Sequence, residues 1–148
     1  MLLDAALLST GIDDVAGTAR DLEAQGYAGV WASEADHDPF LPLLTAGLAT
    51  SSLQVGTAIA VAFARSPMTL AMTAHDLQRY TRGRFLLGLG TQVRPHVERR
   101  FSMPWSAPAA RMREYVAALR AIWATWQDGV PLRFRGDFYS HKIGRAHV

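Results

Sequence analysis

Residues 26–39 have the sequence Gly-Tyr-Ala-Gly-Val-Trp-Ala-Ser-Glu-Ala-Asp-His-Asp-Pro. The apolar run over residues 28–32 is typical of a buried strand, and it ends abruptly in four ionisable side chains: Glu34, Asp36, His37 and Asp38. Pro39 favours the start of a helix, with Asp38 as its N-cap. Because α/β proteins place their chemistry at the carboxyl ends of parallel strands, we predict a functional site in this loop.

The composition favours one globular domain. The chain has 148 residues, of which 49% are hydrophobic and 19% charged, with a net charge of +2 and a pI near 9.4. This charge is too small to indicate a nucleic-acid partner, and no apolar run approaches transmembrane length. The chain has no cysteine, and its first residues lack the basic region of a signal peptide. We therefore expect a cytoplasmic protein that binds no nucleic acid or membrane.

The chain repeats a strand–helix pattern four times. Strands are predicted to start near residues 2, 28, 53 and 84, and the third is predicted to run from 53 to about 63 as one apolar strand. A loop over residues 90–107 is followed by a helix with a continuous apolar stripe, and residues 130–139 are predicted to form a hairpin. Such crossovers are right-handed and give a parallel sheet. The pattern is consistent with a four-stranded doubly wound sheet or with half of a (β/α)8 barrel, and periodicity alone does not separate the two.

Several of these segments, in order, resemble one known family. They are residues 26–34, residues 36–43 and the run Val-Gly-Thr-Ala-Ile-Ala-Val-Ala-Phe-Ala-Arg-Ser-Pro at 55–67. Together with residues 87–93, 98–101 and 111–126, they are similar to the luciferase-like monooxygenase superfamily, in its coenzyme F420-dependent branch. The resemblance covers residues 1 to about 140. It implies the N-terminal half of a (β/α)8 TIM barrel, with four βα units and a C-terminal hairpin.

The resemblance also implies a set of site residues. His37 stands where many members place a histidine near the reactive ring carbon, with Glu34 or Asp36 orienting its imidazole. Members that use deazaflavin carry a non-proline cis peptide at the segment that corresponds to Ala58–Ala60. The implied cofactor-binding residues are Ala58, Ile59, Ala60, Val61, Gly90, Thr91 and Gln92. Gln92 departs from those relatives that carry an acidic proton donor there, and the family's main phosphate-binding region lies in later strands that this chain does not contain.

Each of these residues also has a purely structural explanation. Asp38 is explained as a helix cap, Trp31 as a core residue and the arginines of the 90–107 loop as a solvated face. Gly88-x-Gly90 lacks the third glycine of a dinucleotide-binding motif. We predict no metal site, because neighbouring residues on one loop rarely converge on an ion.

The resemblance implies hydride transfer between coenzyme F420 and a small organic substrate that the sequence does not identify. The alternatives are an FMN-dependent luciferase-like monooxygenase, a non-catalytic cofactor-binding module and an inactive truncation. Residues 143–148 match the translation of a common sequencing adapter, so we interpret them as a non-native tail after a natural domain of residues 1–142. A half barrel leaves sheet edges exposed, and we therefore expect a homodimer or other self-association.

Overall fold

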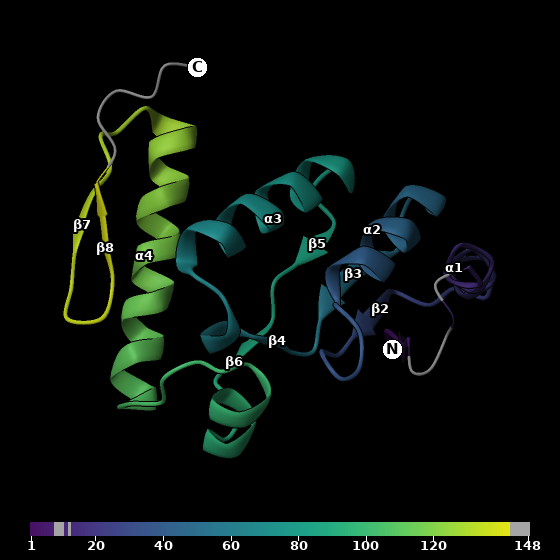
Figure 1. The fold of residues 1–148 in the computed structure, drawn as a ribbon. Helices are drawn as coiled ribbons and strands as arrows, with labels where there is room; N and C mark the ends of the chain where they lie inside the picture. The colour runs from purple at the N-terminus through teal and green to yellow at the C-terminus, as the bar shows by residue number, and fades with distance from the viewer. Residues whose placement is uncertain (8–10, 12, 143–148) are drawn as a thin grey trace. The chain divides into compact units, whose positions relative to one another are not determined.

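The computed structural model describes residues 1–7, 11 and 13–142. The predicted non-native tail at 143–148 therefore lies outside the described residues. The chain divides into two compact units (Figure 1). The first unit contains residues 1–60 and 73–90, and the second contains residues 61–72 and the chain from 91 onward.

A four-stranded parallel sheet forms the centre of the first unit. Its strands are β1 (Asp4–Ala6), β2 (Gly29–Ala32), β3 (Gln54–Thr57) and β5 (Phe85–Leu86), and they lie side by side in that order. The pairs are parallel at every step. The predicted sequential strand order is therefore confirmed.

Helices pack on one face of this sheet. They are α1 (Val15–Ala24), α2 (Phe40–Ala49) and α3 (Pro67–Tyr80), of which α3 runs from the second unit into the first. Phe40 of α2 packs on Phe85 of β5 with ring centroids 6.4 Å apart. Leu43, Val30 and Val55 are fully buried, so this is the core of the unit.

The helix ends follow the predicted chemistry. The Asp38 carboxylate accepts hydrogen bonds from Phe40 N at 2.8 Å and Leu41 N at 3.3 Å, and so caps α2. Gly26 has a φ of 83° just after α1, the left-handed conformation that glycine adopts without strain. Ser66 caps α3 through a bond from Thr69 N at 3.2 Å. The predicted cap at Asp38 is thereby confirmed, and Gly26 and Ser66 follow the same local chemistry.

The prediction of one long third strand over residues 53–63 was wrong. Residues 53–63 form β3, then β4 (Ala60–Val61), then a short helical turn, η1 (Ala62–Ala64). The predicted fourth strand is likewise divided, into β5 and β6 (Leu89–Gly90), and β6 pairs with β4.

One side chain explains both breaks. The Thr57 hydroxyl donates to Gly88 O at 2.7 Å and accepts from Gly88 N at 2.9 Å, so it takes both backbone groups of Gly88. Beyond Thr57 the chain stays beside Gly88, because Ala60 N also donates a hydrogen bond to Gly88 O at 2.9 Å. Apolar periodicity carries no information about such a side-chain lock, because the flanking residues are apolar in either conformation.

Two charged residues, Arg84 and Glu23, hold the backbone at the amino end of β3. The Arg84 guanidinium donates to Gly47 O, Thr50 O and Leu53 O, at 2.8, 3.0 and 2.6 Å, and so binds the carboxyl end of α2. Glu23 of α1 accepts hydrogen bonds from the backbone just before β3. The amino end of β3 is therefore held by side chains from α1 and from the residue just before β5.

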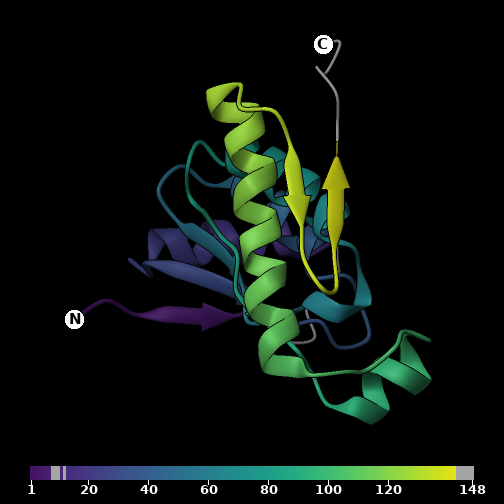
Figure 2. The ribbon, with the colours of Figure 1, turned by 90° about the vertical axis from the view of Figure 1, so that its left-hand side faces the viewer.

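The second unit is built on α4 (Pro108–Asp128). The hairpin of β7 (Arg133–Arg135) and β8 (Ser140–Lys142) runs alongside this helix (Figure 2). The Glu114 carboxylate of α4 accepts hydrogen bonds from the three backbone N–H groups of residues 137–139. A Cβ at Gly136 would collide with the Glu114 carboxylate, so the turn between β7 and β8 requires a glycine at this position.

Buried contacts tie α4 to the rest of its unit. Tyr115 is fully buried and donates to Arg65 O at 3.1 Å, and Trp123 donates to Ala71 O at 3.1 Å. The loop predicted over residues 90–107 contains a short helical segment, η2 (His96–Arg100), in which Val97 is fully buried.

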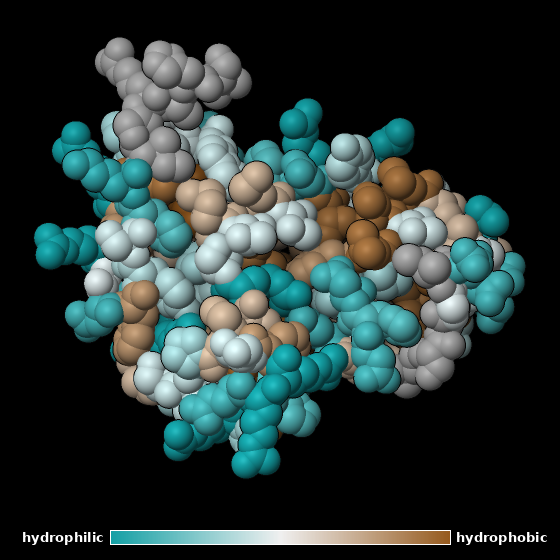
Figure 3. All heavy atoms as spheres, viewed as in Figure 1, coloured by the Kyte–Doolittle hydropathy of each residue, from teal (hydrophilic) through white to brown (hydrophobic). Residues whose placement is uncertain are grey.

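The surface of α2 is unusually apolar. Leu41 and Leu48 are 56% and 63% exposed, and Figure 3 shows apolar residues gathered over this helix. Even so, none of the helices in the described part of the chain has the length and apolar character needed to cross a bilayer.

Candidate functional site

The predicted catalytic loop follows β2 and ends at the cap of α2. Its last residue, Asp38, is held by the two N–H bonds of that cap. Its first half is held by a backbone hydrogen bond from Glu34 N to Ile59 O at 3.1 Å. The loop is therefore fixed at both ends, with Asp36 and His37 exposed between the two anchors.

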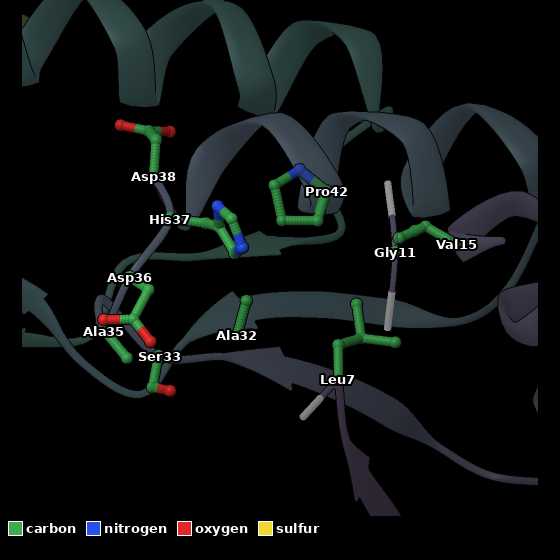
Figure 4. Close-up of a pocket in the computed structure, with 10 residues that line it drawn as sticks. All are labelled: Leu7, Gly11, Val15, Ala32, Ser33, Ala35, Asp36, His37, Asp38 and Pro42. Atoms are coloured by element: carbon green, nitrogen blue, oxygen red, sulfur yellow. The ribbon is translucent and has the colours of Figure 1, made fainter. Parts of the chain in front are cut away.

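A cavity of about 410 Å³ opens beside this loop (Figure 4). We call it the loop cavity. Its lining comes from the end of β1, the start of α1, the end of β2, the catalytic loop and the first turn of α2: Leu7, Gly11, Val15, Ala32, Ser33, Ala35, Asp36, His37, Asp38 and Pro42. All ten residues belong to the first unit.

The loop cavity has an apolar base and a polar rim. Val15 and Ala32 are buried, and Leu7 and Pro42 are half-buried. In Figure 4 the imidazole of His37 points over Ala32 toward Pro42, whereas the carboxylate of Asp36 points toward Ser33. Within the described part of the chain, no side-chain hydrogen bond fixes the His37 ring, so it can turn toward a ligand.

The other face of the sheet carries a row of residues that follows the strand register. Ala6 pairs with Trp31, Trp31 with Gly56, and Gly56 with Leu86. The indole of Trp31 lies directly over Gly56, where a Cβ would collide with the ring. Leu86 is 42% exposed. This face is opposite the helices, because Val30 and Val55 alternate with the residues of the row.

Small residues lie at the next level of the strands. We call Ala58, Ile59, Gly88 and Gly90 the strand-end strip. Ala58 is exposed, and the other three are half-exposed. Gly90 packs on the Ile59 side chain, where a Cβ would lie 2.7 Å from Cδ1. The peptide bond between Ala58 and Ile59 is cis, at the position that the family resemblance implied.

The structure thus brings some of the predicted site residues together. Glu34, Ile59 and Gly90 form one contiguous chain of contacts, with Ala58 and Ala60 on either side of Ile59. Asp36 and His37 line the loop cavity. Glu34 is not among the residues that line it.

The remaining predicted residues belong to the second unit. Val61 is buried, and its carbonyl accepts a hydrogen bond from Arg65 at 3.1 Å. Thr91 donates its hydroxyl proton to Gln92 O at 3.0 Å, and Gln92 has a φ of 59°. The cofactor role of these three residues stays a prediction.

Sequence reasoning missed several residues that shape the site. Thr57 locks Gly88, and Trp31 covers Gly56 beneath the strand-end strip. Leu7, Val15 and Pro42 line the loop cavity. Leu7, Val15 and Pro42 all lie where a strand ends or a helix begins. Their place next to these predicted element ends is the sequence signal that could have identified them. Among the described residues, no group of three His, Asp or Glu side chains could hold a metal ion.

Comparison with known proteins assigns the family. The luciferase-like monooxygenase family matches residues 3–147. The uncharacterized protein Rv1360 of Mycobacterium tuberculosis is 63% identical over 128 residues, which cover 86% of this chain and 38% of that protein. Rv3520c of the same organism, named as a candidate coenzyme F420-dependent oxidoreductase, is 35% identical over 103 residues, which cover 69% of this chain and 30% of Rv3520c.

Solved structures show the same fold. The oxygenating constituent of 3,6-diketocamphane monooxygenase from Pseudomonas putida, in complex with FMN, superposes with a TM-score of 0.82 at 17% identity, covering 97% of this chain and 45% of that chain. The coenzyme F420 dependent tetrahydromethanopterin reductase from Methanopyrus kandleri gives 0.77 at 18% identity, covering 98% and 45%. The chain thus spans less than half the length of these proteins. It belongs to the luciferase-like monooxygenase family and corresponds to half of that family's TIM barrel.

Proposed function

We propose that this chain is the N-terminal half of an oxidoreductase that transfers a hydride between coenzyme F420 and a small organic substrate. The observation that carries the proposal is the hydrogen bond from Glu34 N to Ile59 O, at 3.1 Å. It joins the loop that bears His37 directly to the strand-end strip. A cofactor on the strip and a proton-transferring group on the loop would then share one rigid support.

The strand-end strip suits a flat ring. Ala58 is exposed, Gly88 and Gly90 are half-exposed, and none of them carries a side chain beyond Cβ. A planar heterocycle can therefore approach the backbone closely. Trp31, one level lower on the same face, supplies an apolar base for it.

The chain's own residues would supply position and proton transfer. When bound, a deazaflavin supplies or accepts the hydride. For a carbonyl substrate, the oxygen gains a proton as its carbon gains the hydride, and the His37 imidazole would donate that proton. In the reverse direction, His37 would accept the proton from the alcohol.

Coenzyme F420 is preferred over FMN because of Rv3520c, which shares 35% identity with this chain and is named for F420. An FMN-dependent monooxygenase is the second candidate, supported by the fold shared with the FMN-bound camphane enzyme. The two candidates differ in which cofactor is bound and in whether oxygen is consumed.

The test uses a chimera in which residues 1–142 replace the segment of Rv1360 that they match. The chimera and its Ala58→Leu variant are titrated with F420 and with FMN, following absorbance and fluorescence. Leu41→Ala on the exposed surface of α2 is the matched control. We expect F420 to bind the chimera and the control, and Ala58→Leu to weaken that binding at least tenfold by blocking the ring.

Two results would contradict the proposal. One is tight binding of FMN with oxygen consumption and no affinity for F420, which favours the monooxygenase. The other is F420 affinity that does not respond to Ala58→Leu, which removes the strand-end strip from the cofactor site. A His37→Asn variant that binds F420 but transfers hydride at the parent rate would remove His37 from the chemistry.

A further inference from the structure

The backbone of the strand-end strip makes its hydrogen bonds within the protein. Gly88 O accepts from the Thr57 hydroxyl at 2.7 Å and from Ala60 N at 2.9 Å, and Gly88 N donates to the same hydroxyl at 2.9 Å. A carbonyl oxygen has two lone pairs and an N–H has one proton, so the hydrogen-bonding capacity of Gly88 is filled. A ligand on the strip therefore finds no free polar group at Gly88.

The neighbouring residues of the strip have the same property. Ala58 N donates to Ala32 O at 2.8 Å, and Ile59 O accepts from Glu34 N at 3.1 Å. These bonds are directed to β2 and to the catalytic loop, and the side chains of Ala58 and Ile59 are aliphatic. The strip thus offers contact area to the face of a flat ring and few partners to the polar groups at the edge of that ring.

Thr57 maintains this arrangement without entering the strip. It is 1% exposed and lies on the same side of β3 as the fully buried Val55, because side chains alternate along a strand. Its hydroxyl therefore holds Gly88 from the side of the helices and leaves the open side of the strip clear. A Cβ at Gly88 would collide with Thr57 O, so the two segments lie too close for any side chain at residue 88.

The hydroxyl group is the part of Thr57 that matters. A hydroxyl both donates and accepts, so serine can replace threonine in the lock, whereas valine has the shape of threonine and no polar group. Without the hydroxyl, the half-exposed Gly88 would have an unpaired N–H at the strip. That N–H would bind water, and the apolar face of a ring would have to displace this water without replacing its hydrogen bond.

We propose that Thr57 is a positioning residue that keeps the strand-end strip free of unpaired polar groups. The strip then recognises the face of a planar tricyclic aromatic ring and not the hydrogen-bonding pattern of its edge. That this ring belongs to a deazaflavin rests on the proposed function, whereas recognition by the face does not. The contribution of the strip to binding should therefore be the same for flat rings with different edges.

The lock is measured first in the 148-residue chain, without any ligand. Amide hydrogen exchange is quenched in a denaturing solvent and then measured by NMR, so that self-association does not interfere with the measurement. Thr57→Val should speed the exchange of Gly88 N–H at least tenfold, and Thr57→Ser should keep it slow. Val55 N, which donates to Arg84 O, is the internal reference and should stay protected in both variants.

Ring binding is measured in the Rv1360 chimera with three flat rings that carry no phosphate tail. Lumiflavin and 5-deazalumiflavin differ in one atom of the central ring, and N-methylacridone lacks their pyrimidinedione edge. Thr57→Val should weaken the binding of all three at least tenfold, with losses that agree within about threefold, and Thr57→Ser should restore it. Leu77→Val shortens a buried side chain of α3 outside the strip, so it should lower the midpoint of urea unfolding and leave the three affinities unchanged.

Each outcome supports or overturns the proposal. A loss confined to one ring would show that the strip reads the edge, and unchanged Gly88 exchange in Thr57→Val would remove the lock; either result overturns it. An equal loss of affinity in Leu77→Val would reduce Thr57 to a residue of general stability. Failure of the folded chimera to bind any ring would refute both this inference and the proposed function. Equal losses for the three rings without affinity for F420 would support this inference and refute the proposed function. F420 binding that does not respond to Thr57→Val would do the reverse.

Discussion

Glu23 offers a sharp test of how the amino end of β3 is held. Its Oε1 atom accepts hydrogen bonds from Ser51 N at 2.9 Å, Ser52 N at 2.6 Å, Ser52 Oγ at 2.8 Å and Leu53 N at 3.1 Å. The Ser52 N–H and hydroxyl bonds are the main reason why the pKa of Glu23 falls from 4.5 to about 2. The carboxylate is therefore stabilised in its charged form only when the chain is folded.

The magnitude follows from that shift. A pKa lowered from 4.5 to about 2 corresponds to about 3 kcal/mol of stabilisation. Solvent screening at this half-exposed side chain reduces the expected value to about 1–2 kcal/mol. We expect Glu23→Gln to lower the free energy of unfolding by this amount near neutral pH, because the amide keeps an acceptor but loses the charge.

The pH dependence has a definite sign. The folded-state pKa lies below the unfolded value, so the stabilisation is complete above pH 4.5 and is lost as the pH falls from 4.5 toward about 2. Urea unfolding followed by circular dichroism, at pH values across this window, measures it in the parent and in Glu23→Gln. The variant should lose this part of the pH dependence.

Asp21→Asn is the matched control, because it changes an exposed acid on the same helix. It should alter the free energy of unfolding by no more than about 0.5 kcal/mol. The reasoning would be refuted if Glu23→Gln were as stable as the parent at neutral pH and kept the same response to acid.

Three further predictions concern the second unit, the strand-end strip and the whole chain. Arg111→Met should lower the free energy of unfolding by about 2–4 kcal/mol, because it removes the hydrogen bonds to Pro104 O and the Tyr139 hydroxyl. An unchanged midpoint of urea unfolding would contradict this prediction. Gly88→Ala should destabilise the chain by more than the conservative Ala58→Ser, because a Cβ at Gly88 would collide with the Thr57 carbonyl; equal stability of the two variants would show that the lock can relax. The isolated 148-residue chain should self-associate without catalysing turnover, since it has exposed sheet edges at β1 and β5 and an apolar α2 surface. Light scattering measures this, and a monodisperse monomer that turns over substrate would refute it.

Sequence predicted those parts of the fold that depend on local chemistry. Asp38 could be assigned as a cap and Gly26 as a helix stop, because each effect involves neighbouring residues only. The strand order followed from consecutive crossovers. The division of the third strand could not be predicted, because it depends on Thr57 bonding to Gly88, a contact across 31 positions.

The candidate site shows the same division. His37 and Asp36 were singled out because a cluster of ionisable side chains follows a buried strand; both line the loop cavity, and their catalytic role stays a prediction. The loop cavity was not predicted, since its base comes from Leu7, Val15 and Pro42, which are unremarkable apolar residues until the fold brings them together. Arg111 was missed because arginine is rarely buried, and here it is 7% exposed with its guanidinium over the Phe63 ring.

The central claim is that the strand-end strip binds the ring of a deazaflavin beside the loop that carries His37. A crystal structure of the Rv1360 chimera with bound F420 tests it most directly. The account predicts that the ring lies against Ala58, Gly88 and Gly90, with the His37 loop at its edge. A ring bound elsewhere, with the strip covered by protein side chains, would contradict the account.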